Sequence, residues 1–156
     1  MAKHMIAGTP DEFVKKLRRR PPFMGRLLAL DPGETTGWCL FETLQLKETG
    51  QFTVNTPLDF DRLIGKYEPQ VIVAENYRVY ASQAKRHVGS EVPTVQYLGV
   101  IKFVAEQRGI PLHLQMAFAA KGFMTDSRLR ALRVLQTNRR HSNDAIRHAM
   151  YWLVFG

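Results

Sequence analysis

Three carboxylates in this chain lie next to apolar segments. Asp31 follows the apolar run 27–30, and Glu75 follows the β-branched run 71–74. Asp144 lies in the first turn of a helix expected near the end of the chain. A carboxylate beside a buried segment is costly unless a hydrogen-bond donor, a cation or a metal compensates its charge. Taken alone, Asp31 in its Asp-Pro-Gly sequence is most simply explained as a residue that caps its own turn.

Carboxylates that converge from different elements would have a specific chemistry. They would repel one another and have raised pKa values unless cations neutralised them. Hard divalent cations with oxygen ligands meet this need, and Mg²⁺ keeps waters and open positions for phosphate oxygens. Two such ions about 4 Å apart can activate a water and stabilise the leaving oxygen of a phosphodiester. The three acids are therefore candidate ligands of a hydrolytic metal site, provided that the fold brings them together.

Two histidines flank the third acid. His141 lies three residues before Asp144 and shares a helix face with it if the helix extends back far enough. We predict a functional role for His141, as a metal ligand or a general base. His148 lies four residues after Asp144 and is interpreted as an ordinary surface residue of the helix.

A β-sheet should position the first two acids. In the stretch 26–42, two apolar runs are joined by a turn rich in Pro and Gly, which predicts a hairpin with Asp31 at the end of its first strand. A half-exposed third strand is expected across 44–54. The run 71–75 is apolar on both faces, as is typical of a central strand covered on both sides. A strand at 111–115, preceded by a helix, predicts a parallel neighbour for it.

Helices are expected around these strands, so the pattern indicates an α/β fold with a mixed sheet. Capping residues predict helices from Thr9 to about Arg19, from 56–59 onward, and from Ser142 or Asn143 onward. Apolar spacing predicts two more, over 94–108 and 126–135. The expected inward residues are Leu58, Leu63, Ile64 and Tyr67 in the second helix, and Val95, Leu98, Ile101 and Val104 or Ala105 in the helix over 94–108. We divide the chain into a basic N-terminal helix or arm, 1–25, and one domain, 26–156.

The basic character of the chain points to a polyanionic partner. Its 156 residues include 22 Lys and Arg against 14 Asp and Glu, a formal net charge of +8. Such a balance most simply indicates nucleic acid, although charge alone fits a merely basic protein equally well.

The single cysteine, Cys39, excludes an internal disulfide and a Cys-based zinc site. No apolar run is long enough to span a membrane, and we expect a cytoplasmic protein.

Aromatic and basic residues are interleaved in the segment 76–93, which suits base stacking and phosphate pairing. The alternative is an ordinary exposed loop with a short helix at 81–88. A basic cluster at 15–20 fits a phosphate contact and a solvated helix end equally well. The candidate DNA-binding residues of the chain are Tyr77, Arg78, Tyr80, Lys85, Arg86, Lys121, Arg139 and Arg140.

Three short segments resemble, in order, the motifs of RuvC-type Holliday junction resolvases, which belong to the RNase H-like superfamily. The segments are Leu28-Ala29-Leu30-Asp31-Pro32-Gly33, Val73-Ala74-Glu75 and His141-Ser142-Asn143-Asp144-Ala145. The resemblance extends from about Leu27 to Leu153. It implies an RNase H-like mixed sheet flanked by helices, cleavage of four-way DNA junctions with two Mg²⁺ per active site (or Mn²⁺ in their place), and a homodimer. Asp31, Glu75 and Asp144 would be metal ligands, and His141 stands where the family has an acid or a histidine.

The chain also departs from the family pattern. A helix precedes the first strand, and Arg78 stands where the family has an aromatic residue thought to engage the junction, beside Tyr77 and Tyr80. The compact, divergent chain suggests a bacteriophage member, acting in DNA recombination and repair in a bacterial cell or a phage-infected host.

Four hypotheses about function follow. The leading one is a Mg²⁺-dependent, structure-selective endonuclease that resolves four-way junctions. A second keeps the fold and the metals but cuts flaps, forks or RNA–DNA hybrids. A third is a DNA-binding module without catalysis. In a fourth, the turn 31–37 would be the phosphate-binding hairpin of an actin-like protein, which is disfavoured because that superfamily needs a second, related domain.

Overall fold

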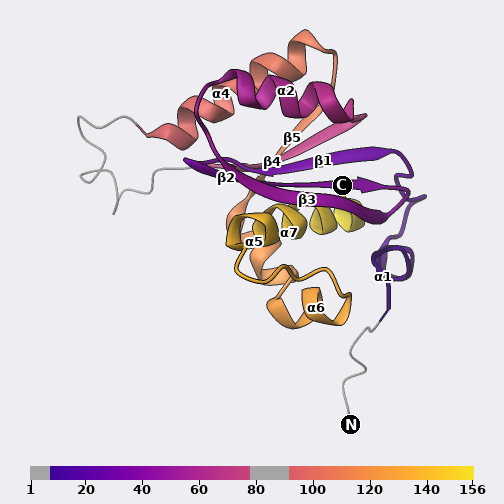
Figure 1. The fold of residues 1–156 in the computed structure, drawn as a ribbon. Helices are drawn as coiled ribbons and strands as arrows, with labels where there is room; N and C mark the ends of the chain where they lie inside the picture. Colours follow the sequence, from indigo (N-terminus) through magenta and orange to yellow (C-terminus); the bar gives the residue numbers. More distant parts are fainter. Residues whose placement is uncertain (1–7, 78–91) are drawn as a thin grey trace.

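The computed structural model describes residues 8–77 and 92–156, whose strands form one mixed sheet in the order β3-β2-β1-β4-β5 (Figure 1). β1 pairs antiparallel with β2 and parallel with β4; β2 and β3 are antiparallel, and β4 and β5 are parallel. This confirms the predicted hairpin, the third strand, the central strand and its parallel neighbour. The strands are β1 (Arg26–Asp31), β2 (Thr35–Glu42), β3 (Gln45–Thr53), β4 (Val71–Asn76) and β5 (Leu112–Met116).

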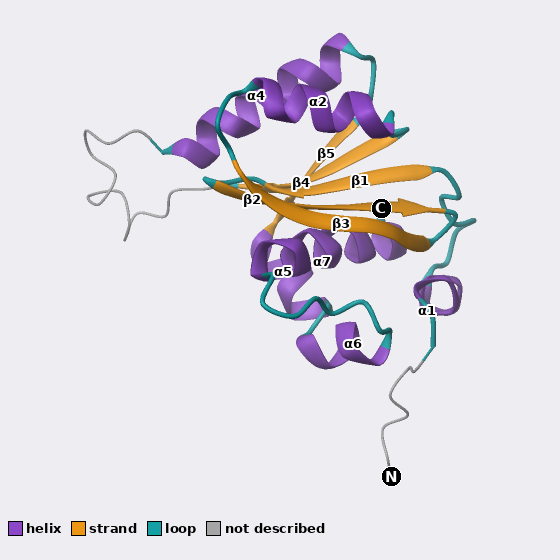
Figure 2. Cartoon of the chain, in the orientation of Figure 1, coloured by secondary structure: helices purple, strands orange, loops and turns teal. Residues whose placement is uncertain are grey.

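Helices cover both faces of this sheet, which confirms the predicted α/β architecture (Figure 2). One face carries α2 (Leu58–Tyr67) and α4 (Pro93–Gln107). The other face carries α7 (Arg140–Phe155), with α5 (Ala117–Phe123), α6 (Asp126–Ala131) and α1 (Pro10–Leu17) beside it. Within the described ranges, no helix is both long and apolar enough to cross a membrane.

Alternation along the central strands decides which face the acids occupy. In β1, Leu27 and Ala29 pack in the core under α7, whereas Leu28 and Leu30 pack in the core under α2 and α4. β4 alternates in the same way, with residues 71 and 73 toward α7. Successive side chains of a strand point to opposite faces. The next odd-numbered residue of each strand, the acid, therefore lies on the α7 face.

Two predicted helix faces are partly wrong. Leu58 is 57% exposed and Val95 is 50% exposed, although both were expected to point inward. Each lies in the first turn of its helix, and its side chain faces outward. Phe60, which was not predicted, is fully buried instead of Leu58.

The helix predicted over 126–135 is also too long. α6 ends at Ala131, and Arg133 adopts a left-handed backbone conformation with φ of 59°. The turn lets Leu132 and Val134 both enter the core, and the backbone N–H of Val134 donates to the Leu129 carbonyl over 3.0 Å. Apolar spacing alone does not separate this arrangement from a continued helix.

The N-terminal helix shares the α7 core. Thr9 caps α1 by accepting a hydrogen bond from the Glu12 backbone N–H, as predicted. Phe13 and Val14 are buried in the core on that side. The Arg18 guanidinium donates to the Leu153 carbonyl over 2.8 Å, near the end of α7.

Candidate active site

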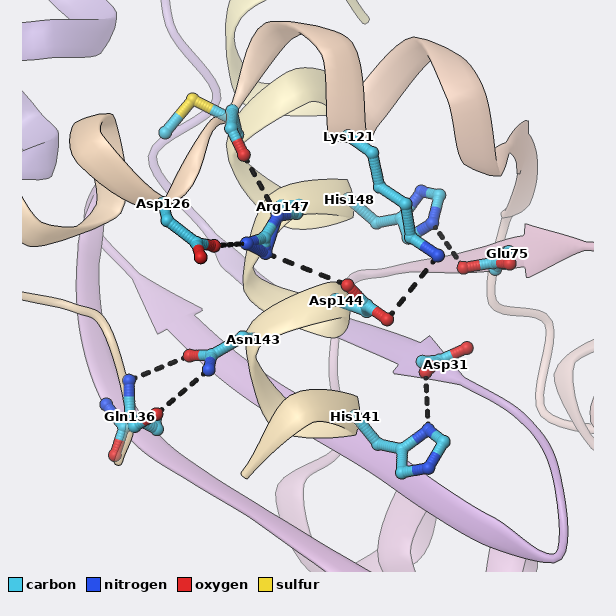
Figure 3. A network of polar contacts seen from close by, with 11 residues as sticks. Asp31, Glu75, Lys121, Asp126, Gln136, His141, Asn143, Asp144, Arg147 and His148 are labelled. Carbon is cyan, nitrogen blue, oxygen red and sulfur yellow. Dashed lines mark hydrogen bonds and ion pairs between the residues drawn. The ribbon is translucent and has the colours of Figure 1, made fainter. Parts of the chain in front are cut away.

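The parallel pairing of β1 and β4 brings the first two acids together. Leu30 is in register with Ala74, so Asp31 and Glu75 follow at the adjacent carboxyl ends of the two strands. Asp144 comes from α7, which lies across this face, and its charge acts on Asp31 (Figure 3). The fold therefore places the three predicted acids at one end of the sheet.

The fourth predicted residue, His141, joins this group because α7 begins early. The helix starts at Arg140, not at Ser142 or Asn143 as the capping pattern predicted. His141 therefore lies in the first turn, and its Nδ1 is 2.9 Å from Oδ2 of Asp31. Arg139 precedes the helix without a side-chain cap.

Asn143 has another task than the predicted capping. Its Oδ1 accepts a hydrogen bond from the Gln136 backbone N–H over 2.7 Å, and its Nδ2 donates to the Gln136 carbonyl over 2.9 Å. Through these two bonds the Asn143 side chain satisfies both backbone groups of Gln136 and holds the loop before α7 against the helix. A capping residue and a clamping residue have the same amino-acid type, so the sequence does not distinguish them.

The turn after Asp31 gives α7 room to approach. Gly37 is the cross-strand partner of Asp31, and a Cβ atom at this position would overlap the carbonyl of His141. Thr36 is fully buried; its hydroxyl donates to the Gly33 carbonyl over 2.8 Å, so it shapes the turn. Glycine at 37 thus permits the close contact that sets His141 against Asp31.

The fold shifts the pKa values of Asp31 and Glu75 in opposite directions. Burial, followed by the charge of Glu75, raises the pKa of Asp31 to about 6, and the charge of Asp144 acts in the same direction. The hydrogen bond with His141 opposes this rise. Such mutual repulsion is expected of carboxylates that share one site.

Glu75 behaves in the opposite way, contrary to the expectation for converging acids. Burial favours its neutral form, but the hydrogen bond and charge of His148 outweigh burial and hold the pKa of Glu75 below its usual range. The charge of Lys121 and a hydrogen-bonding contact with Asp31 contribute in the same direction. Cations of the protein thus compensate the second acid.

The interpretation of His148 as a surface residue is wrong. Its side chain is fully buried, with Nε2 3.0 Å from Oε2 of Glu75 and Nδ1 3.0 Å from Oε1 of Gln115. The spacing could have indicated this position, because a residue four positions after Asp144 lies on the same helix face as Asp144.

Two cations hold the third acid. Lys121 Nζ lies 3.5 Å from Oδ2 of Asp144, and Arg147 Nη1 lies 3.7 Å from Oδ1. The buried Arg147 also donates to the Met124 carbonyl over 2.9 Å and pairs with Asp126 (Figure 3). Lys121 was predicted as a DNA-binding residue, whereas the sequence reasoning missed Arg147.

A surface cavity of about 1140 Å³ adjoins Asp144. Lys121, Arg139, Arg140 and Arg147 are among the residues that line it. Three of these four were predicted to bind DNA. Tyr77, another predicted contact, is half-buried against the core under α2 and α4. The remaining candidates Arg78, Tyr80, Lys85 and Arg86, and the predicted helix at 81–88, lie outside the described residues.

Comparison with solved structures shows which known proteins have a similar fold. No protein-family model and no curated protein sequence matches the chain. Among solved structures, Thermus thermophilus RuvC in complex with a Holliday junction substrate has a TM-score of 0.59 and 15% identity, covering 81% of this chain and 91% of that one. The yeast mitochondrial Holliday junction resolvase Ydc2 has a TM-score of 0.57 and 14% identity, and the match covers 92% of this chain and 84% of that one. The fowlpox virus Holliday junction resolvase has a TM-score of 0.55 and 13% identity, and the match covers 82% of this chain and 97% of that one.

The chain has the fold of RuvC-type resolvases. Its mixed sheet with helices on both faces is the RNase H-like arrangement expected from the resemblance. At 13–15% identity these neighbours show the fold, and the chemistry of the site has to be argued from its own residues.

The donor types at this site suit a hard divalent cation. Three carboxylates and the His141 imidazole gather near the ends of β1 and β4, and oxygen donors are what Mg²⁺ prefers (Figure 3). Among the described residues, no group of three or more acidic, His or Cys side chains is gathered closely enough to hold a metal by itself. Lys121 and the raised pKa of Asp31 instead lower the charge of the site, which is the role a bound cation would take over.

Proposed function

We propose that this protein is a Mg²⁺-dependent, structure-selective DNA endonuclease that resolves four-way junctions. One observation carries the proposal: two strand-end carboxylates, Asp31 and Glu75, and the helix carboxylate Asp144 meet at one end of a RuvC-type sheet. The Thermus thermophilus neighbour is a complex with a Holliday junction substrate, which supports this class of DNA for the same fold.

Each residue of the site has a proposed task. Asp31, Glu75, Asp144 and His141 would hold two Mg²⁺, for which Mn²⁺ can substitute. Divalent cations bound there would supply Lewis-acid stabilisation of the charge that develops on phosphodiester oxygens. His141, hydrogen-bonded to Asp31, is placed to accept or pass on a proton.

Basic side chains next to the acids would hold the DNA backbone. Lys121, Arg139 and Arg140 line the cavity beside Asp144, and a cationic cavity attracts phosphates by releasing their counterions. Tyr77, Arg78, Tyr80, Lys85 and Arg86 remain proposed DNA contacts, on the basis of their sequence pattern alone.

We further propose a homodimer, in which two sites act on the two strands of one junction. The face formed by α2 and α4 supports this, because it exposes Leu58, Val95 and Phe103 and contains an apolar cavity of about 470 Å³. Large exposed apolar patches rimmed by polar residues mark interaction surfaces. As the sequence resemblance implies, the dimer would act in recombination and repair in the cytoplasm of a bacterial cell or a phage-infected host.

A cleavage assay with competing substrates tests the proposal. The protein is incubated with Mg²⁺ and labelled four-way junction, flap, RNA–DNA hybrid or linear duplex. We expect two symmetric cuts in the junction and little cleavage of linear duplex. Equal cleavage of all substrates would favour the broader nuclease of the same fold. Binding without cleavage in both Mg²⁺ and Mn²⁺ would favour a non-catalytic DNA-binding module.

A further inference from the structure

His148 and Gln115 form a buried relay behind the second acid. We infer that His148, supported by Gln115, is a positioning residue that fixes the Glu75 carboxylate relative to Asp144. This inference rests on the proposed function, because it treats both acids as ligands of divalent cations. It goes further by assigning a task to two residues that do not belong to the ligand set.

The relay is built on the register of the sheet. Glu75 of β4 and Gln115 of β5 are direct partners in the parallel pairing, so their side chains leave the sheet side by side on the α7 face. The His148 imidazole reaches across both strands, with Nε2 3.0 Å from Glu75 and Nδ1 3.0 Å from Gln115. Each ring nitrogen therefore has one partner, and the ring cannot rotate without losing both.

The polarity of one bond follows from chemistry. An ionised carboxylate can only accept hydrogen bonds, so Nε2 of His148 donates to Glu75. His148 is fully buried, whereas the Glu75 side chain is 21% exposed toward the site. A bond to a buried donor meets little competition from water and is charge-assisted, which makes it a strong restraint on the carboxylate.

A single helix links this restraint to the third acid. Asp144 and His148 lie four residues apart on α7, one turn along the same face. Arg147, between them, ties that turn to the Met124 carbonyl over 2.9 Å. The placement of Glu75 relative to Asp144 is thus determined by one helical turn and one strand pairing, both rigid elements.

Loss of the contacts among His148, Gln115 and Glu75 should weaken metal binding more than DNA binding. Without His148 the Glu75 side chain regains its rotamer freedom, and the oxygen ligands no longer face one another. Partners that orient a metal ligand typically contribute 10–100-fold to metal affinity or activity when they are removed. Arg139 and Arg140, two of the basic residues that would contact the DNA backbone, line the cavity beside Asp144.

The test compares His148→Leu, Gln115→Leu and His148→Gln with the wild type. Mn²⁺ binding is measured by calorimetry without DNA, together with kcat and KM for a four-way junction. We expect His148→Leu to bind Mn²⁺ 10–100-fold more weakly and to lose kcat, with KM for the junction within about twofold. Gln115→Leu should show a smaller loss, and His148→Gln should recover part of the affinity because its amide can still donate to Glu75.

His113→Leu is the matched control. His113 lies on the same strand as Gln115, two residues away, and its ring contacts Trp152 of α7 at 5.3 Å between centroids. It is exposed, and its ring contact is with Trp152 and not with the acids, so Mn²⁺ affinity should not change. Circular dichroism checks the fold of each variant, and Gln115→Leu decides the question if His148→Leu does not fold.

The inference and the proposed function can fail separately. Folded His148→Leu and Gln115→Leu proteins that bind Mn²⁺ within twofold of wild type would overturn the positioning role, even if the wild type cleaves junctions. A wild type that binds Mn²⁺ with the expected variant pattern but cuts no DNA would overturn the endonuclease and leave the relay intact. A wild type that binds no Mn²⁺ would overturn both.

Discussion

At the scale of single residues, Asp31 is an acid whose pKa the fold raises. Burial and the charges of Glu75 and Asp144 raise its pKa to about 6 from 3.8, against the hydrogen bond from His141. Between these two pH values the folded protein binds more protons than the unfolded chain. Its stability therefore falls as pH rises through this window, and the contribution of a neutral Asp31 is lost above about pH 6.

The variant Asp31→Asn should consequently stabilise the metal-free protein at pH 8. Asn is neutral and nearly isosteric, so it removes a buried charge that is fully ionised there. The expected gain in the free energy of unfolding is on the order of 1–3 kcal/mol, and it should shrink toward zero at pH 4. Urea unfolding in EDTA at both pH values measures it, with Glu106→Gln, at an exposed position on α4, as control. A gain that is larger at pH 4 would contradict this charge assignment.

Sequence reasoning singled out Asp31, Glu75, His141 and Asp144, which the fold brings together, but it missed the buried residues that contact them. Asp31 and Glu75 are visible because each ends an apolar run, and strand alternation fixes their common face. His148 and Arg147 are polar residues on a helix, where polarity ordinarily indicates solvent. His148 is buried against Glu75 and Gln115 of the strands, and Arg147 against the segment that contains Met124 and Asp126. Helix periodicity carries no information about which surface a helix meets.

At the scale of elements, the approach of α7 to the hairpin positions the site. The sequence predicted the strands and most helices, since these depend on local patterns. It placed the start of α7 two or three residues too late, because Ser142 and Asn143 are good caps in isolation. Tertiary contacts decided otherwise: Asn143 clamps Gln136, and Gly37 leaves room for the first turn beside His141.

Gly37→Ala tests that approach. Its methyl group would overlap the His141 carbonyl, so α7 must shift away from β2. We expect a loss of roughly 1–3 kcal/mol in the free energy of unfolding, together with reduced cleavage because His141 leaves Asp31. Gly99→Ala on α4 is the control: its Cβ meets no atom within 4 Å, and alanine favours helix. Equal stability of wild type and Gly37→Ala in urea unfolding would refute the tight contact.

The basic cavity beside Asp144 makes a separate prediction about DNA affinity. Arg140→Gln should weaken junction binding and reduce the slope of log affinity against log salt by about 1, because one phosphate contact is lost. Fluorescence anisotropy over a salt series measures the slope. Lys102→Gln, an exposed site on α4, should leave it unchanged. A slope that responds equally to both substitutions would mean that the cavity is not the DNA path.

At the scale of the whole molecule, two opposite surfaces divide the work. The α7 side carries the acids of the site and the basic cavity beside Asp144, and the side formed by α2 and α4 carries exposed apolar residues that include Phe103. Sequence reasoning predicted a homodimer from the resemblance alone. It could not locate an interface, because it expected Leu58 and Val95 to point inward.

Phe103→Glu tests the proposed interface. Phe103 is 65% exposed on α4, and a charge there should separate the two copies. We expect sedimentation velocity to show a dimer for the wild type and a shift toward monomer for the variant. Phe118→Glu is the control, since Phe118 is 70% exposed on α5, on the other side of the sheet. A monomeric wild type at micromolar concentration would contradict the proposed homodimer.

The most direct test of the central claim compares wild type with Asp144→Asn on one labelled four-way junction in Mg²⁺. The substitution removes a carboxylate oxygen from the site and leaves the surrounding cations in place. The account predicts that cleavage falls by at least about a thousandfold, whereas junction affinity, measured without divalent cation, stays within a few-fold. Asp61→Asn, a surface carboxylate paired with Arg108, should cut at the wild-type rate. Wild-type cleavage by Asp144→Asn would contradict the assignment of these acids as the catalytic centre.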